Sequence, residues 1–141
     1  QRVATGIDGK RLSIIIAVLE KRCGHDLSGE DIFVNVVGGL RLDEPAVDLA
    51  VGLAIVSSFR NVPIESKTVA LGEIGLGGEI RPVNQVERRV AEASSLGFER
   101  CLVARSNLKG WKRPEGVEVI GVGGLEAAED LAEEPPIEVM I

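Results

Sequence analysis

The sequence predicts an α/β protein, with short strands that form a mixed sheet and helices that pack against it. β-branched runs at 31–37 and 117–122 alternate with segments such as 9–23, in which apolar residues recur at helical spacing. Strands separated by helices pair in parallel through a crossover, so we expect at least one parallel pair. Aromatic residues make up only 3% of the chain, so the core must consist of aliphatic side chains.

The first helix is expected over residues 9–23. Asp8 precedes it, and Gly24 is placed to end it in a left-handed conformation. The next element is a strand at 31–37, which should end at the glycine pair 38–39.

A second helix begins at Pro45, because the N–H that proline lacks would be unpaired at the first helical position. The residues that follow are apolar on nearly every side of this helix. They include Leu49, Val51, Leu53, Ala54, Ile55 and Val56. We therefore predict that this is the buried central helix.

Two short strands at 69–74 and 78–81 are joined through Gly75 and Gly77, which predicts a tight hairpin. A glycine-rich string can also cradle phosphate, but it does so at the start of a helix. Because these glycines begin a hairpin, turn geometry is the preferred interpretation.

The third helix should be capped by Asn84, run to Ser95 and be closed by Gly97. Two strands, at 100–105 and 117–122, follow it and are separated by a polar loop.

The last helix is expected over residues 125–133 and is stopped by the prolines at 135–136. We assign residues 1–134 to one domain, since a chain of 141 residues suffices for a single core. Residues 135–141 form a C-terminal tail, either a frayed end or a strand that pairs with something else.

The net charge of −6 argues against a free-standing nucleic-acid-binding module, although a local basic face is compatible with it. Two cysteines are too few for a disulfide framework or a four-thiolate zinc site, which favours a reducing compartment. There is no basic-then-apolar leader, and no apolar run is long enough to cross a membrane. We therefore expect a soluble, cytoplasmic protein without a membrane partner.

Several segments occur in an order that is typical of one known family. They are 3–12, 34–41, 43–46, 72–76 and 78–81. Together they resemble the C-terminal Lon protease-like domain of the RadA (Sms) family of bacterial DNA repair proteins, over the chain up to Glu134. The resemblance implies a Lon protease-like two-layer sandwich, similar to the second domain of a small-subunit ribosomal protein.

The resemblance also implies partners and a role. RadA-type proteins form hexameric rings in which a RecA-like ATPase domain moves on single-stranded or branched DNA and promotes branch migration. The chain contains neither a Gly-x-x-x-x-Gly-Lys-Ser/Thr phosphate loop nor a four-cysteine zinc finger. We therefore expect the C-terminal domain alone, with no cofactor of its own; ATP with magnesium, and zinc, are expected only in the absent N-terminal domains.

In Lon-type proteases a serine attacks the substrate and a lysine takes its proton, and the resemblance places these two positions at Ala46 and Arg89. A methyl group cannot attack a carbonyl, and a guanidinium with a pKa above about 12 has no lone pair to accept a proton. Ser57 and Ser58 lie about three helical turns beyond Ala46, so we interpret them as helix-end residues. The resemblance thus predicts a domain without enzyme activity.

Two other polar groups have chemical alternatives. Asp43, Glu44 and Asp48 could hold a divalent cation, but charges that oppose the helix dipole are the preferred interpretation. Cys23 and His25 are two residues apart, so they point to different sides of a helix. We expect a packed cysteine beside a surface histidine, and we assign no metal site.

Three groups of basic residues are candidates for DNA contact, because lysine and arginine neutralise backbone phosphates. They are Lys10, Arg11, Lys21 and Arg22; Arg81, Arg88 and Arg89; and Lys109, Lys112 and Arg113. Most such groups are only solvated surface. Trp111, in a polar loop, is a candidate interface anchor, and a partly buried core position is an equal alternative.

Three alternative functions stay open at this point. The first is an active serine peptidase with an unrecognised nucleophile, which a serine-reactive probe would label. The second is a stand-alone Lon-like binding module comparable to the magnesium-chelatase-like ComM proteins, which the absence of an upstream zinc finger and phosphate loop would favour. The third is a peptide-binding groove retained from the protease at the strand edge beside residues 38–39.

Overall fold

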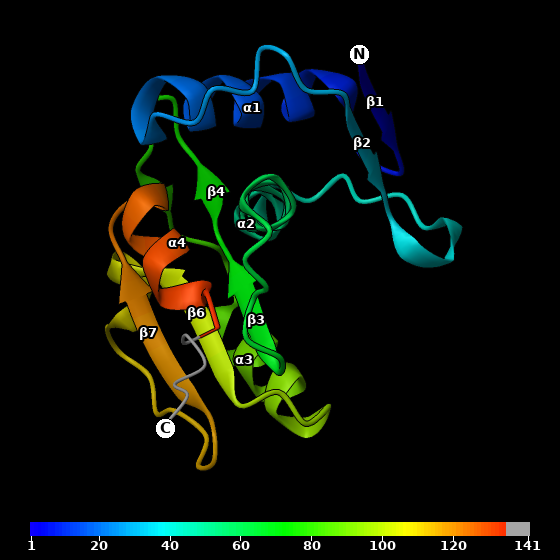
Figure 1. Cartoon of the computed structure of the whole chain (residues 1–141). Coiled ribbons are helices and arrows are strands. Elements are labelled where there is room, and N and C mark those ends of the chain that lie inside the picture. The colour runs from blue at the N-terminus through cyan, green and yellow to red at the C-terminus, as the bar shows by residue number, and fades with distance from the viewer. Residues whose placement is uncertain (135–141) are drawn as a thin grey trace, which may run out of the picture.

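A central helix, α2 (Asp48–Arg60), lies between two groups of strands in the computed structural model (Figure 1). The structure describes residues 1–134, so the predicted tail at 135–141 lies outside the described residues. Helix α1 (Gly9–Cys23) crosses above α2, with a pair of strands at one of its ends and a larger sheet below α2 (Figure 1).

The strands form three small sheets. They are β1 (Arg2–Thr5), β2 (Ile32–Asn35), β3 (Thr68–Leu71), β4 (Glu73–Ile74), β5 (Ile80–Arg81), β6 (Arg100–Ala104) and β7 (Glu118–Val122). β1 pairs with β2 in parallel, β3, β6 and β7 form a parallel sheet in that order, and β4 and β5 form an antiparallel hairpin. The predicted α/β class and the parallel crossovers are confirmed.

The remaining helices are α3 (Val86–Ser95) and α4 (Leu125–Ala132), and 3₁₀ turns cover Val37–Gly39, Pro45–Val47 and Arg105–Leu108. The three-stranded sheet has a core on each face. Along β6, Leu102 and Ala104 pack in the cluster that includes α1, α2 and α4, whereas Cys101 and Val103 pack against α3. This alternation follows from the two-residue period of a strand. β6, which lies between β3 and β7, therefore contacts both cores.

The first helix begins and ends as predicted. A carboxylate oxygen of Asp8 accepts a hydrogen bond from the backbone N–H of Lys10 at 3.3 Å, and Gly24 follows the helix with φ +73°. The strand predicted at 31–37 is shorter, because β2 ends at Asn35 and the chain then turns through Gly38 at φ +83°.

The hairpin prediction is correct for its second half only. The run 69–74 is not one strand, because Gly72 separates β3 from β4 and the two belong to different sheets. The Gly72 N–H donates to the carbonyl oxygen of Ala46 at 2.9 Å, and the Gly72 carbonyl accepts from the N–H of Leu49 at 3.0 Å. These bonds turn the chain toward the start of α2, a tertiary contact that local sequence does not encode.

The predicted cap of the third helix is wrong. The residue before α3 is Gln85, which has φ +53° and makes no side-chain capping bond. The side chain of Asn84 instead accepts a hydrogen bond from Arg89 at 2.7 Å. The side chain of Asn84 therefore binds Arg89 of α3 and does not cap the helix.

The predicted complete burial of the central helix is also wrong. Leu49, Leu53 and Val56 are buried in the core, whereas Ala50 and Ala54 on the opposite side are exposed. Within residues 1–134, one side of α2 is covered and the other faces an open hollow.

Candidate functional site

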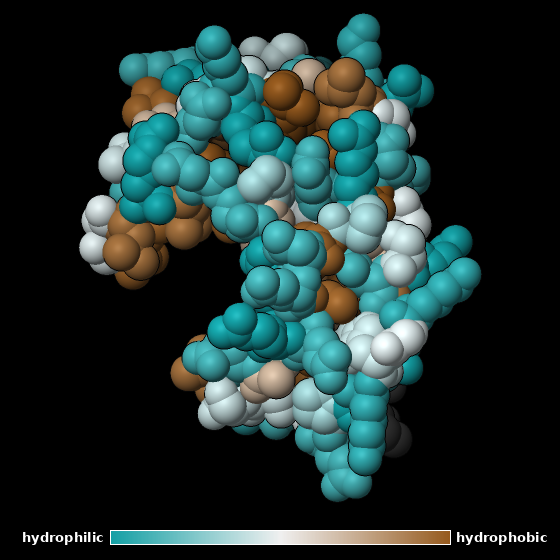
Figure 2. Space-filling model, turned by 180° about the vertical axis from the view of Figure 1, so that it is seen from behind, coloured by the Kyte–Doolittle hydropathy of each residue, from teal (hydrophilic) through white to brown (hydrophobic). Residues whose placement is uncertain are grey.

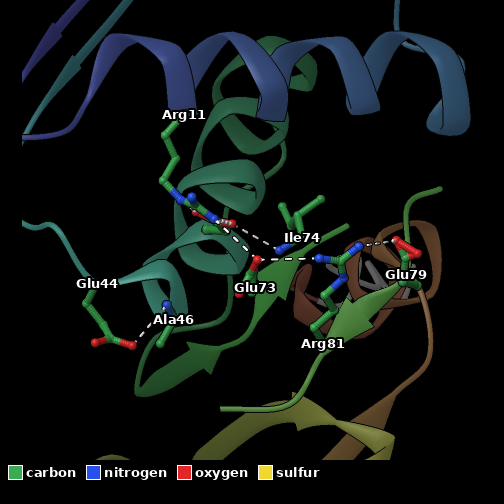
Figure 3. Close-up of polar contacts among 8 residues, drawn as sticks. Arg11, Glu44, Ala46, Glu73, Ile74, Glu79 and Arg81 are labelled. Carbon is green, nitrogen blue, oxygen red and sulfur yellow. Dashed lines mark hydrogen bonds and ion pairs between the residues drawn. The ribbon is translucent and has the colours of Figure 1, made fainter. Parts of the chain in front are cut away.

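The two positions that the resemblance assigned to a catalytic pair meet at the start of α2. Ala46 lies in the 3₁₀ turn before the helix and is 2% exposed. An oxygen of Glu44 accepts from the N–H of Ala46 at 3.4 Å, the contact drawn in Figure 3, and from the Arg89 guanidinium at 3.3 Å. The Arg89 guanidinium also donates to the backbone carbonyl of Asn84 at 2.9 Å.

This arrangement offers no group that can attack a carbonyl. Ala46 contributes a methyl group, and the guanidinium of Arg89 donates to oxygens of Glu44 and Asn84. Guanidinium has no acceptor lone pair, so it cannot take a proton from a nucleophile. Neither of these two side chains can therefore act as the nucleophile or as its general base.

An ion pair between α1 and the first turn of α2 lies next to the site on the core side of α2. Asp48, in the first turn of α2, is 1% exposed, and its two oxygens accept from Arg11 of α1 at 2.6 and 2.5 Å. The same carboxylate accepts from the backbone N–H of Ile74 in β4 at 3.1 Å, which Figure 3 also draws. The hydrogen bond that Arg11 donates to Asp48 is the largest cause that raises the pKa of Arg11. Asp48 thus joins α1, α2 and the β4–β5 hairpin.

Around this ion pair, charged side chains form a weaker outer network. Arg81 lies 3.6 Å from Glu73 and 3.9 Å from Glu79, and Arg11 lies 3.9 Å from Glu73. The Arg81–Glu73 pair joins the two strands of the hairpin, and the Arg11–Glu73 pair joins the hairpin to α1 (Figure 3). Such long, solvated contacts contribute little to stability, so the buried Asp48 is the member that matters for the fold.

The three acidic residues predicted as a cluster point to separate partners. Asp43 pairs with Arg41 at the surface, Glu44 bonds Ala46 and Arg89, and Asp48 is buried with Arg11. In the part of the chain that the structure describes, no three His, Cys, Asp or Glu side chains are arranged to hold a metal ion.

An apolar groove of about 560 Å³ leads away from the site. Its floor is the open side of α2, its walls are β2 and part of β3, and Ala46 and Arg89 lie at one end. In Figure 2 it is the hollow between the two lobes of the molecule, and apolar residues gather at the tip of the upper lobe. Phe33, on the groove wall, is 65% exposed.

The two serines on α2 differ in their position relative to the groove. The Ser57 hydroxyl donates to the carbonyl of Val62 at 2.8 Å, as expected of a helix-end residue. Ser58 lines the groove at the end opposite to Ala46. About three turns of α2 separate Ser58 from Ala46, and Arg89 lies at the Ala46 end of the groove. Ser58 and Arg89 therefore do not form one site.

A second buried polar pair lies near the other end of α2. His25 was expected at the surface, but its side chain is only 14% exposed, and its Nε2 lies 2.9 Å from a carboxylate oxygen of Glu129 in α4. Its ring packs edge-on against Phe59 of α2. Burial is the largest cause that raises the pKa of Glu129. Sequence reasoning missed this pair because its members are 104 residues apart.

The cysteine beside this pair is packed, as expected. Cys23 is half-buried at the end of α1, and burial together with nearby Glu129 raises its pKa to about 12. A thiol with such a pKa stays protonated near neutral pH and is a poor nucleophile. Cys23 and His25 therefore form no reactive pair.

The structure divides the predicted DNA-contact residues into two sets. Arg11, Arg81 and Arg89 have carboxylate partners within 4 Å. Among the described residues, no such partner lies near the exposed Lys10, Lys21, Arg22, Arg88, Lys109, Lys112 and Arg113. Arg105, exposed at the start of a 3₁₀ turn, belongs to the second set and was not predicted.

Trp111 occupies the partly buried position that was one of its two predicted roles. It packs against the cluster under α3, and its indole N–H donates to the carbonyl of Asn107 at 2.6 Å. The guanidinium of Arg113 lies 5.5 Å from the centre of its ring. Trp111 thus holds the basic loop against the body of the domain.

Residues 8–107 match the family model described as subunit ChlI of Mg-chelatase, which is more than half of the chain. The chain belongs to this family. The matched range includes both Ala46 and Arg89.

Similar proteins include DNA repair protein RadA of Bacillus subtilis (strain 168), which is 49% identical over 128 residues, or 91% of this chain. RadA of Halalkalibacterium halodurans is 50% identical over the same length, and RadA of Listeria monocytogenes is 49% identical over 122 residues, or 86% of the chain. The resemblance to RadA predicted from the sequence is confirmed. The chain spans 27–28% of the length of these relatives.

None of the helices within residues 1–134 combines the length and the apolar character that a membrane crossing requires.

Proposed function

We propose that the chain is a non-catalytic Lon-like domain that supports the assembly and the DNA contact of a RadA-type DNA repair protein. The observation that carries this proposal is the meeting of Ala46 and Arg89 at Glu44. Both positions lie at the end of a groove, as a catalytic pair would, yet neither side chain can perform the chemistry. The retained scaffold without its reactive groups supports a structural role.

The role of the whole protein enters through the relatives, which are named DNA repair protein RadA. In this proposal, copies of the domain pack side by side in a hexameric ring and support an attached RecA-like ATPase domain in the cytoplasm. That ATPase moves on single-stranded or branched DNA, and ATP, magnesium and zinc bind in other domains of the protein.

The proposed DNA contacts of this domain are the basic residues of α3 and of the loop after β6 that have no carboxylate partner among residues 1–134. Arg88 lies on α3, and Lys109, Lys112 and Arg113 lie in the loop that Trp111 holds against the same side of the sheet. Free cations on one layer of an acidic protein can attract a phosphate backbone, because charges act locally at physiological salt.

The first test measures DNA binding and mass together. Light scattering over a concentration series should reveal association of the domain, and fluorescence anisotropy should reveal salt-dependent binding of a single-stranded oligonucleotide. Replacing Lys109, Lys112 and Arg113 with alanine should lower the salt slope by about 2, given roughly 0.7 per phosphate contact on a single strand. Lys67→Ala, which removes a charge that already pairs with Glu99, is the matched control. A monomer that is indifferent to DNA would overturn the proposal.

The second test concerns the absence of catalysis. A fluorophosphonate probe, which reacts with activated serines, should leave the wild-type chain unlabelled. Labelling that disappears in a Ser57→Ala or Ser58→Ala variant would establish an active peptidase instead.

A second candidate function is that of a stand-alone Lon-like module in a ComM-like protein, and the match to the ChlI family favours it. The coding sequence upstream of this domain distinguishes the two. A phosphate loop preceded by a four-cysteine zinc finger would support the RadA-type protein, and the lack of the zinc finger would support the alternative.

A further inference from the structure

We infer that the tip of the β4–β5 hairpin of one copy docks into the apolar groove of a neighbouring copy. This inference rests on the proposed assembly and names the two surfaces that make the contact. It is argued from the shape, the charge and the relative position of the two surfaces.

The groove has the properties of a receiving surface. Its volume of about 560 Å³ lies within the range of 300–1,000 Å³ that is usual for binding pockets. Its floor contains the small residues Ala50 and Ala54, which leave room above α2, and Phe33 exposes an aromatic ring on its wall. Contiguous exposed apolar surface of this kind marks an interaction site.

The hairpin tip has the properties of the inserted part. Leu76, between β4 and β5, is 70% exposed. The turn that carries it is ordered: the N–H of Gly75 donates to the carbonyl of Glu79 at 2.9 Å, and the N–H of Gly77 donates to the Glu79 carboxylate at 3.2 Å. Because these bonds fix the backbone of the turn, the ordering of the loop costs little when the Leu76 side chain binds.

The charges around the two surfaces are complementary. Lys21 and Arg22 lie in the last turn of α1, and the Arg22 side chain packs against the hairpin at the position of Gly78. Within residues 1–134, neither has a carboxylate partner within 4 Å, and the carboxylate of the exposed Glu30 at the rim of the groove has no cationic partner, whereas its neighbour Asp31 pairs with the amino group of Gln1 at 2.8 Å. Opposite charges at the two rims favour this pairing and fix its orientation.

The hairpin tip and β2, which forms a wall of the groove, lie toward opposite ends of α1 (Figure 1). The hairpin tip packs at Gly78 against Arg22, at the C-terminal end of this 15-residue helix, whose length is about 22 Å at 1.5 Å per residue, and β2 lies toward the N-terminal end. One chain therefore cannot fill its own groove with its own hairpin. Two different surfaces on opposite sides produce a head-to-tail contact, which closes into a ring when the rotation between copies allows it.

The experiment blocks each surface separately and then mixes the variants. Leu76→Asp places a charge on the hairpin tip, and Ala54→Arg fills the groove from an exposed helix position. Each variant alone should remain monomeric in light scattering, with the midpoint concentration of association raised about tenfold or more. An equal mixture should form dimers, because each pair still contains one intact hairpin and one intact groove.

Matched controls place the same changes elsewhere. Leu96→Asp alters another exposed leucine, and Ala127→Arg alters an exposed alanine of α4. Both should associate like the wild type, and circular dichroism should confirm that all four variants are folded. If the wild type associates and the two blocking variants associate equally well, or if their mixture stays monomeric, the hairpin contact is wrong while the assembly stands. If the wild type itself is monomeric at every concentration, the proposed assembly is overturned and the contact with it.

Discussion

The two sides of helix α2 have similar sequences and opposite environments. Toward the core, Leu49 and Leu53 are buried, and Gly52 lets α1, the β4–β5 hairpin and α4 approach closely. Toward the groove, Ala50 and Ala54 are exposed although they are also apolar. Apolar character therefore indicates which surfaces seek a partner, but it does not indicate whether that partner belongs to the same chain.

The polar residues at the start of α2 repeat this contrast. Asp48 faces the core and is fixed by Arg11 and the N–H of Ile74. Glu44 is half-exposed and pairs with Arg89, which lines the groove, at the longer distance of 3.3 Å. A change on the core side should therefore affect stability, and a change on the groove side should affect association instead.

The largest expected effect comes from shortening a core-facing leucine. Leu53→Ala should lower the free energy of unfolding by about 3 kcal/mol, because it leaves a cavity in a closely packed cluster. Val51→Ala, which removes apolar volume from the groove floor, should lower it by less than about 1 kcal/mol. Urea unfolding of both variants measures the difference. Equal losses would mean that the groove side is packed as tightly as the core.

The next effect comes from the buried carboxylate. Asp48→Asn should lower the free energy of unfolding by about 2 kcal/mol, since it removes the charge that compensates Arg11, and the partial exposure of Arg11 limits the loss. Asp43→Asn, the exposed counterpart beside Arg41, should change it by less than about 0.5 kcal/mol. Thermal unfolding followed by circular dichroism checks both. A negligible effect of Asp48→Asn would show that hydrogen bonding to the amide suffices.

The smallest effect concerns the pair near Phe59, which lines the groove and packs against His25. Burial is the main cause that raises the pKa of Glu129, while His25 and Arg60 lower it and Asp130 raises it. The folded state therefore binds this proton more tightly than the unfolded chain. The resulting stability is present below the ordinary glutamate pKa of about 4.3 and is lost as the pH rises through the folded-state pKa.

Glu129→Gln cannot ionise, so it should remove this part of the pH dependence. The free energy of unfolding of the variant, relative to the wild type, should increase as the pH rises from about 4 toward neutrality. Glu126→Gln, an exposed neighbour on α4, should keep a nearly constant difference over the same range. Urea unfolding at several pH values tests this, and a constant difference for Glu129→Gln would contradict it.

Local signals in the sequence were reliable where an element depends on its own residues. The first helix has the bounds that Asp8 and Gly24 predicted, and β6 and β7 agree with their predicted runs to within one residue. The signals failed where a distant group intervenes. Gly72 splits a strand because Ala46 and Leu49 bind its backbone, and Asn84 gives up its capping role because it bonds Arg89.

The candidate site shows the same division. The resemblance named Ala46 and Arg89 from sequence, and the chemical limits of a methyl group and a guanidinium follow from the residue types alone. Glu44 as the acceptor between them was not foreseen, because only the fold brings α3 to the start of α2. A buried aspartate in an otherwise apolar helix is a signal that could have predicted a partner for Asp48, since such residues are rarely buried unpaired.

By itself, the sequence determined the α/β class, most of the helices and strands, and the residue types at positions 46 and 89, because these depend on residue type and short-range spacing. Only the tertiary structure decided that α2 has an open side, and that Arg11 pairs with Asp48 and His25 with Glu129. It also decided that the hairpin tip and β2, a wall of the groove, lie toward opposite ends of α1. These features depend on contacts between residues far apart in the chain, and the packing of whole elements determines which side chains meet.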